Sequence, residues 1–131
     1  MFEQETDGIL VRVTPTFLPH ESDPAEQRFV WAYAVEIVNL SAATVQLMSR
    51  YWRITNEMGV TQEVRGPGVI GEQPVIMPGA AHAYASGCPL TTPSGVMVGA
   101  YTMRDVTTDR LFDIAIPAFA LDSPHGARLA N

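Results

Sequence analysis

The chain has 131 residues, enough for one domain, and its 47% hydrophobic content excludes disorder as a description of the whole molecule. Its formal net charge is −6, from 14 acidic and 8 basic side chains, so its surface repels phosphate backbones and no nucleic acid is expected as a partner. No apolar run approaches the roughly 20 residues that span a bilayer, so no membrane insertion is expected.

The first forty residues predict two β-strands. Residues 1–7 are polar and acidic, and we expect them to form a flexible N-terminus. From residue 8 to 17, Ile9, Val11 and Val13 alternate with other side chains, which favours a strand with one buried face. A loop containing prolines follows, and residues 28–40 are then apolar on both faces. That pattern favours a strand in the centre of a sheet.

The same alternation continues through the second half of the chain. It predicts strands over residues 44–56, 60–65, 81–86, 95–103 and 111–121, separated by turns rich in Gly, Pro, Asp and Asn. Residues 122–131 are expected to form a flexible tail. Seven or eight strands at even spacing predict an all-β fold, an antiparallel two-sheet β-sandwich of the fibronectin type III or immunoglobulin kind. Residues 8–121 are the expected single domain.

The most distinctive stretch is residues 64–78, where three glycines and three prolines surround short apolar pairs. This composition excludes a helix and predicts a shaped loop against the sheet. Gly66, Gly68 and Gly71 have the G-x-G-x-x-G spacing of dinucleotide-binding loops, but that chemistry needs a helix start immediately afterwards, and prolines and a predicted strand follow instead. Two interpretations remain open: an anion nest for a nucleotide or pyrophosphate beside Arg65, or a structural role for glycines at positive φ.

A second distinctive stretch combines two aromatic and two cationic side chains on one predicted strand. Alternation sends Tyr51 and Arg53 to one face and Arg50 and Trp52 to the other, so one aromatic is expected to enter the core. An aromatic beside an arginine on a sheet face is typical of protein contact sites, although arginine stems that merely cover aromatics give the same pattern. The candidate interaction surface comprises Arg50, Tyr51, Trp52, Arg53, Glu72 and Gln73.

No set of residues predicts a metal site, and no cofactor is expected. The histidines, His20, His82 and His125, fall on separate segments without metal-binding spacing. Asp105 and Asp109 share one turn but do not form a calcium-loop pattern.

Catalysis is not expected either. Ser86 and Ser94 lack a nucleophile-elbow pattern, and the single cysteine, Cys88, has no recognisable base and is expected to be a small apolar residue in or beside a turn. We therefore expect a protein that is not an enzyme. One cysteine forms no intrachain disulfide, and the acidic first residues do not resemble a secretory signal, so a cytoplasmic location is expected.

Five motifs follow one another along the chain. They are Arg50-Tyr51-Trp52-x-Ile54, Gly66-x-Gly68-Val69-x-Gly71-Glu72-Gln73-Pro74, Pro78-Gly79, Ser86-Gly87-Cys88-Pro89-Leu90 and Pro93-Ser94-Gly95-x-Met97-x-Gly99-x-Tyr101-x-Met103. Together they resemble the ApaG (CorD) family, over residues 9–121. The resemblance implies a fibronectin type III-like sandwich, an association with cobalt resistance and magnesium efflux, and a role in protein contacts, without established catalytic residues. A protein partner of unknown identity is expected, and edge strands also permit a homodimer.

Overall fold

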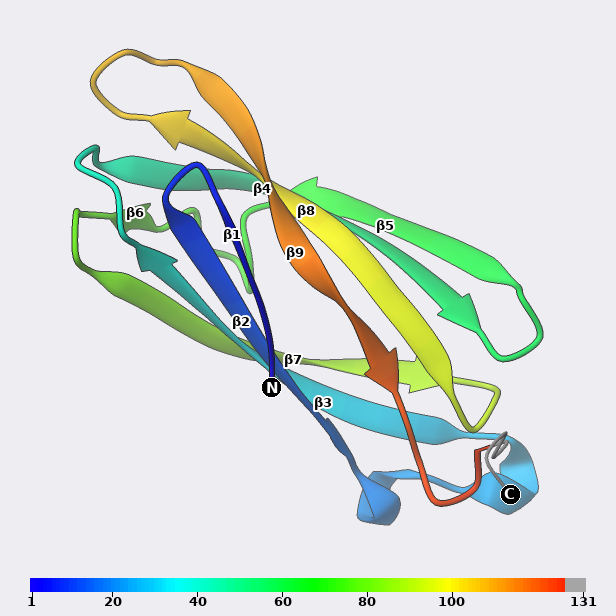
Figure 1. The fold of residues 1–131 in the computed structure, drawn as a ribbon. Helices are drawn as coiled ribbons and strands as arrows, with labels where there is room; N and C mark the ends of the chain where they lie inside the picture. Colours follow the sequence, from blue (N-terminus) through cyan, green and yellow to red (C-terminus); the bar gives the residue numbers. More distant parts are fainter. Residues whose placement is uncertain (127–131) are drawn as a thin grey trace.

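The computed structural model describes residues 1–126 and forms a sandwich of two antiparallel β-sheets (Figure 1). The all-β fold class is therefore confirmed. The strands are β1 (Phe2–Thr6), β2 (Ile9–Phe17), β3 (Phe29–Asn39), β4 (Val45–Asn56), β5 (Thr61–Pro67), β6 (Val75–Ile76), β7 (Ala81–Leu90), β8 (Gly95–Asp105) and β9 (Leu111–Leu121). Two short 3-10 turns, η1 (Pro19–Glu21) and η2 (Pro24–Glu26), lie between β2 and β3. Within residues 1–126 no helix is long and apolar enough to cross a membrane.

One sheet has the strand order β1–β2–β3–β7, and the other has the order β5–β4–β8–β9, with β6 paired to β4. Strand β3 lies between two neighbours, as its two apolar faces predicted. Alternate side chains of both sheets point between the layers and form one hydrophobic core. Its fully buried members include Ile9, Val11, Trp31, Ile37, Leu47, Met97, Tyr101, Met103, Ile114, Phe119 and Leu121.

The N-terminal residues differ from the flexible segment expected over residues 1–7, because residues 2–6 form β1 and pair with β2. The backbone N–H of Ala115 in β9 donates to Thr6 Oγ1 at 3.2 Å, and the Phe2 ring lies 6.0 Å from the Phe119 ring. These contacts join the first strand to the last. One flank of the sandwich, between the edge strands β1 and β9, is thereby closed.

The segment after β9 is also held in place where the structure describes it. Trp31 Nε1 donates to the carbonyl oxygen of Asp122 at 2.8 Å, and Ser123 Oγ donates to the carbonyl oxygen of Pro93 at 2.6 Å. The flexible tail expected over residues 122–131 is therefore not seen at residues 122–126. The rest of that prediction, residues 127–131, lies outside the described residues.

Strand β7 extends past its predicted end at Ser86 and runs through Gly87 and Pro89 to Leu90. Pro89 lies opposite Val30 of β3. Because β7 is an edge strand, a residue without an N–H group does not interrupt the sheet. This extension corrects the position of Cys88, which is a buried strand residue, 4% exposed, rather than a residue in or beside a turn.

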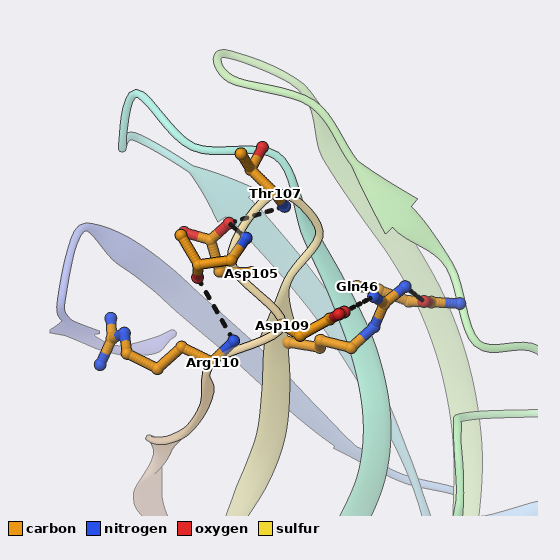
Figure 2. Close-up of polar contacts among 7 residues, drawn as sticks. Gln46, Asp105, Thr107, Asp109 and Arg110 are labelled. Atoms are coloured by element: carbon orange, nitrogen blue, oxygen red, sulfur yellow. Dashed lines mark hydrogen bonds and ion pairs between the residues drawn. The ribbon is translucent and has the colours of Figure 1, made fainter.

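The two aspartates of the turn between β8 and β9 bind other groups of the protein (Figure 2). The Asp105 carboxylate accepts the backbone N–H of Thr107 at 2.9 Å, and Asp109 pairs with Arg104, whose Nη2 donates to Gln46 Oε1 at 2.8 Å. Both carboxylates therefore stabilise the turn. Among residues 1–126, no three His, Cys, Asp or Glu side chains are grouped in a way that would hold a metal ion, and the expectation of no metal site stays a prediction.

Candidate functional site

Strand β4 sorts its aromatic and cationic side chains as alternation predicted. Trp52 points between the sheets and is 3% exposed, and Arg50 lies on the same side, half-buried. Tyr51 and Arg53 lie on the outer face of the five-stranded sheet, where Tyr51 is half-buried and Arg53 is exposed. The four residues thus lie on two different faces of the sheet, one facing the inside of the sandwich and one facing outward.

On the inner side, Arg50 holds the glycine loop against β4. Its Nη1 donates to the carbonyl oxygens of Pro67 and Gly68, both at 3.0 Å. Gln73 adds a second attachment, because its Nε2 donates to the Met48 carbonyl at 2.8 Å. The loop is therefore fixed to the sheet by side chains of both segments.

The tip of the loop is a tight two-residue turn. Val69 and Glu72 exchange both backbone hydrogen bonds, at 2.8 and 3.0 Å, and the two residues between them, Ile70 and Gly71, have φ angles of 47° and 73°. This is the geometry of a type I′ hairpin turn. Ile70 is β-branched, and the left-handed conformation costs such a residue about 1–2 kcal/mol. Its side chain is nonetheless 61% exposed at the tip.

Two different structural constraints explain why glycine occupies these three positions. Gly68 and Gly71 have positive φ angles, as the structural interpretation requires. Gly66 does not need one: it lies opposite Arg50 in the β4–β5 pairing, and a Cβ there would come within 3.0 Å of the guanidinium nitrogens. At Gly68 a Cβ would lie 1.9 Å from the carbonyl oxygen of Glu72. The spacing is thus explained by the shape of the loop and by the volume of Arg50.

The predicted anion-binding residues, Arg65, Gly66, Gly68 and Gly71, do not converge on one point. Arg65 lies on the outer face, away from the turn, and forms an ion pair with Glu63 at 3.4 Å. Inside the loop, the N–H of Gly68 donates to the Met48 carbonyl, and those of Val69 and Glu72 donate within the turn. Strand β6, rather than a helix, follows the loop. These features favour the structural interpretation of the glycines.

The outer face of the five-stranded sheet presents an ordered aromatic and charged group. The Arg65 guanidinium lies 4.4 Å from the centre of the Tyr51 ring, and the Tyr51 hydroxyl donates to Glu63 at 2.6 Å, which raises the pKa of that tyrosine. A concavity of about 400 Å³ adjoins this pair and reaches Thr102 and Asp113. Of the other predicted surface residues, Glu72 is exposed near His82, at 3.9 Å, while Gln73 is engaged in fixing the loop.

Inside the sandwich, hydroxyl groups gather around Arg50. Tyr33 and Ser86 line the same two cavities as Arg50, and the hydroxyls of Tyr84 and Tyr101 are hydrogen-bonded to each other. Burial is the main cause that raises the pKa of Tyr33, Tyr84 and Tyr101 above the ordinary value of a phenol, while the nearby charge of Arg50 acts in the opposite direction. Two cavities, of about 230 and 150 Å³, both have Tyr33, Arg50, Trp52 and Ser86 in their walls.

The sequence pattern did not identify this inner group. The first available signal was Tyr33, which alternation places on the buried face of β3, where a phenol needs a polar partner. The second signal, a cation on the same face as Trp52, was visible at Arg50, but its neighbours come from β3 and β7 and depend on the packing of the two sheets.

The comparisons with known proteins agree with the fold and the motifs. The family model described as "ApaG domain" matches residues 19–105. Protein ApaG of Paramagnetospirillum magneticum is 57% identical over 125 residues, covering 95% of both chains, and Protein ApaG of Brucella suis is 56% identical over the full length of both. A crystal structure of an ApaA protein from Bordetella pertussis superposes with a TM-score of 0.85 at 43% identity, covering 88% of this chain and 94% of the other. The chain belongs to the ApaG domain family.

Proposed function

We propose that this chain is a non-enzymatic, cytoplasmic protein-interaction module that contacts its partner through the outer face of the five-stranded sheet. The observation that carries the proposal is the stacked pair of Tyr51 and Arg65 beside the 400 Å³ concavity. Tyrosine and arginine are the side chains that most often dominate protein interfaces, and a pair already stacked in the free protein loses little entropy on binding.

The charges of this face point to an acidic or mixed-charge partner surface. Arg53 is exposed next to the Tyr51–Arg65 pair, and among the residues that the structure describes it forms no ion pair. A carboxylate of a partner would supply the missing counter-charge. The exposed loop tip lies apart from this face, because Glu72 is 3.9 Å from His82 of the other sheet and Ile70 lines an inner cavity, so neither residue is included in the proposed surface.

The test compares capture of partners by the wild-type protein and by variants. A Tyr51→Ala/Arg65→Ala double variant should lose a binding protein that the wild type captures from a cell extract. The matched control is Arg12→Ala, which removes an exposed arginine paired with Glu3 and Glu36 on the outer face of the other sheet. Equal loss in both variants, or in neither, would overturn the proposed surface.

The association with cobalt resistance and magnesium efflux forms part of the same proposal. We place the module in that process through its protein partner, so the Tyr51→Ala/Arg65→Ala variant should fail to restore cobalt tolerance to a cell that lacks the gene, while Arg12→Ala should restore it. Restoration of cobalt tolerance by both variants would show that the efflux association does not depend on this surface.

A nucleotide or pyrophosphate at the Gly66–Gly71 loop is the second candidate function, and it receives less support. Three loop amides already donate inside the protein, and Glu72 adds a negative charge beside the turn. An amide NMR titration with pyrophosphate and with magnesium-ATP decides between the two. Saturable shifts confined to the loop would favour the anion site, and unchanged spectra would leave the loop with its structural role.

A further inference from the structure

The strongest feature whose role is only partly explained is the half-buried guanidinium of Arg50 between the two sheets, which fixes the glycine loop through one of its nitrogens. Both of its hydrogen bonds to the loop use Nη1. Within residues 1–126, neither Nη2 nor Nε of Arg50 has a protein acceptor, and no carboxylate pairs with this arginine. Because the guanidinium is half-buried rather than sealed, these N–H groups are open to water and can accept an incoming anion, which would supply a counter-charge.

The groups around Arg50 are suited to hold that anion. Tyr33 and Ser86 present hydroxyl groups in the walls of the same two cavities, and Tyr84 adds a third in the smaller one. The phenols are neutral at neutral pH, and burial raises their pKa further, so they offer hydrogen bonds without repelling a negative charge. The site therefore combines one cation with several neutral donors.

The remaining walls are apolar, which limits the rest of the ligand. Trp52, Val64, Cys88 and Met97 line the larger cavity, of about 230 Å³. A cavity of ~150 Å³ is large enough for a benzene ring. One aromatic ring therefore fits in the larger cavity with its substituent directed to Arg50. A whole nucleotide does not, because sites for larger ligands run to roughly 300–1,000 Å³.

The charge of the site selects among anions. A carboxylate has one negative charge and matches the paired donors of a guanidinium with its two oxygens. A phosphate monoester brings a second charge that the single cation at this half-buried point does not neutralise. We propose that the two adjoining cavities bind a small carboxylate that carries one apolar ring, with its carboxylate on Arg50 and its ring against Trp52.

The two tryptophans of the chain give the site a direct readout. Trp52 lines both cavities, whereas Trp31 lines neither, and its indole N–H is hydrogen-bonded to the carbonyl oxygen of Asp122. Titration of the ¹⁵N-labelled protein with sodium benzoate should shift the Trp52 indole and Ser86 amide signals saturably, with the Trp31 indole unchanged. Benzamide, which has the same shape without the charge, should bind at least about tenfold more weakly, as expected for losing a hydrogen-bonded charge pair.

Variants then locate the charged contact. Arg50→Met should weaken benzoate binding roughly tenfold or more, and Tyr33→Phe by a few-fold, as expected for losing a charged or a neutral hydrogen bond. Arg12→Met, which changes an arginine on the outer face of the other sheet, is the control and should bind as the wild type. If Arg50→Met does not fold, the benzoate and benzamide comparison on the wild-type protein still decides the proposal. Equal binding of the two probes, equal binding of inorganic phosphate, or an unchanged Trp52 signal would overturn it.

Discussion

Replacing Gly68 by alanine tests whether the glycine spacing serves the shape of the loop. The change forces a Cβ to 1.9 Å from the carbonyl oxygen of Glu72, which is backbone and does not rotate away. Gly71→Ala is the matched control, because Gly71 also has a positive φ but a Cβ there has no neighbour within 4 Å. Both variants lose about 1–2 kcal/mol through the left-handed backbone, and Gly68→Ala loses a further ~1–3 kcal/mol through overpacking.

Urea denaturation followed by tryptophan fluorescence measures both variants. With an m-value of about 2 kcal/mol/M, Gly71→Ala should lower the midpoint by ~0.5–1 M and Gly68→Ala by ~1–2.5 M. Both proteins should still fold, since a domain of this size typically has a stability of roughly 5–15 kcal/mol. Equal midpoints for the two variants would refute the steric explanation and return the glycine spacing to a role in ligand binding.

Three further predictions concern the core and its edges. Asn39 is fully buried and makes four side-chain hydrogen bonds, to Ser41, Ala43 and Ile76. Asn39→Ala should therefore lower the free energy of unfolding, measured in urea, by about 2–4 kcal/mol, and a loss below ~1 kcal/mol would contradict the contribution of these bonds. Burial raises the pKa of the Cys88 thiol from its ordinary value of 9.0 to about 11. The stability that the buried neutral thiol contributes is fully present below pH 9. It is lost, by up to about 2 kcal/mol, as the pH rises towards 11, so the free energy of unfolding of Cys88→Ala should fall less than that of the wild type over that interval. Trp31→Phe removes the bond to Asp122, so it should lower the free energy of unfolding by about 1–2 kcal/mol and speed the removal of residues 122–126 by carboxypeptidase; an unchanged rate of removal would show that other contacts hold residues 122–126.

The strand pattern was readable from the sequence because side-chain direction alternates locally along a strand. Residues 28–40 gave the central strand β3 correctly, and the opposite faces of Tyr51 and Trp52 followed from the same rule. Strand β1 was missed because its residues are mostly exposed and polar, and it is held by pairing with β2 and by contacts with β9, far along the chain.

The candidate sites were harder to predict because they depend on register and on packing between sheets. The role of Gly66 follows from its position opposite Arg50 in the β4–β5 pairing, which no local pattern specifies. Ile70 has a positive φ, which β-branched residues disfavour, so its conformational propensity predicted the wrong backbone at this position. The grouping of Tyr33, Ser86 and Arg50 required the two sheets to be stacked in space.

The joining of β1 to β9 has a consequence for synthesis on the ribosome. Thr6 is synthesised 109 residues before its partner Ala115. The nascent chain therefore contains β1 and β2 before the opposite sheet is complete. The contact between β1 and β9, which are far apart in the sequence, must then form in a slow later step. We expect the native sandwich to form only around the time the last strand leaves the exit tunnel, so that a chain stalled before residue 111 exposes its apolar faces to chaperones.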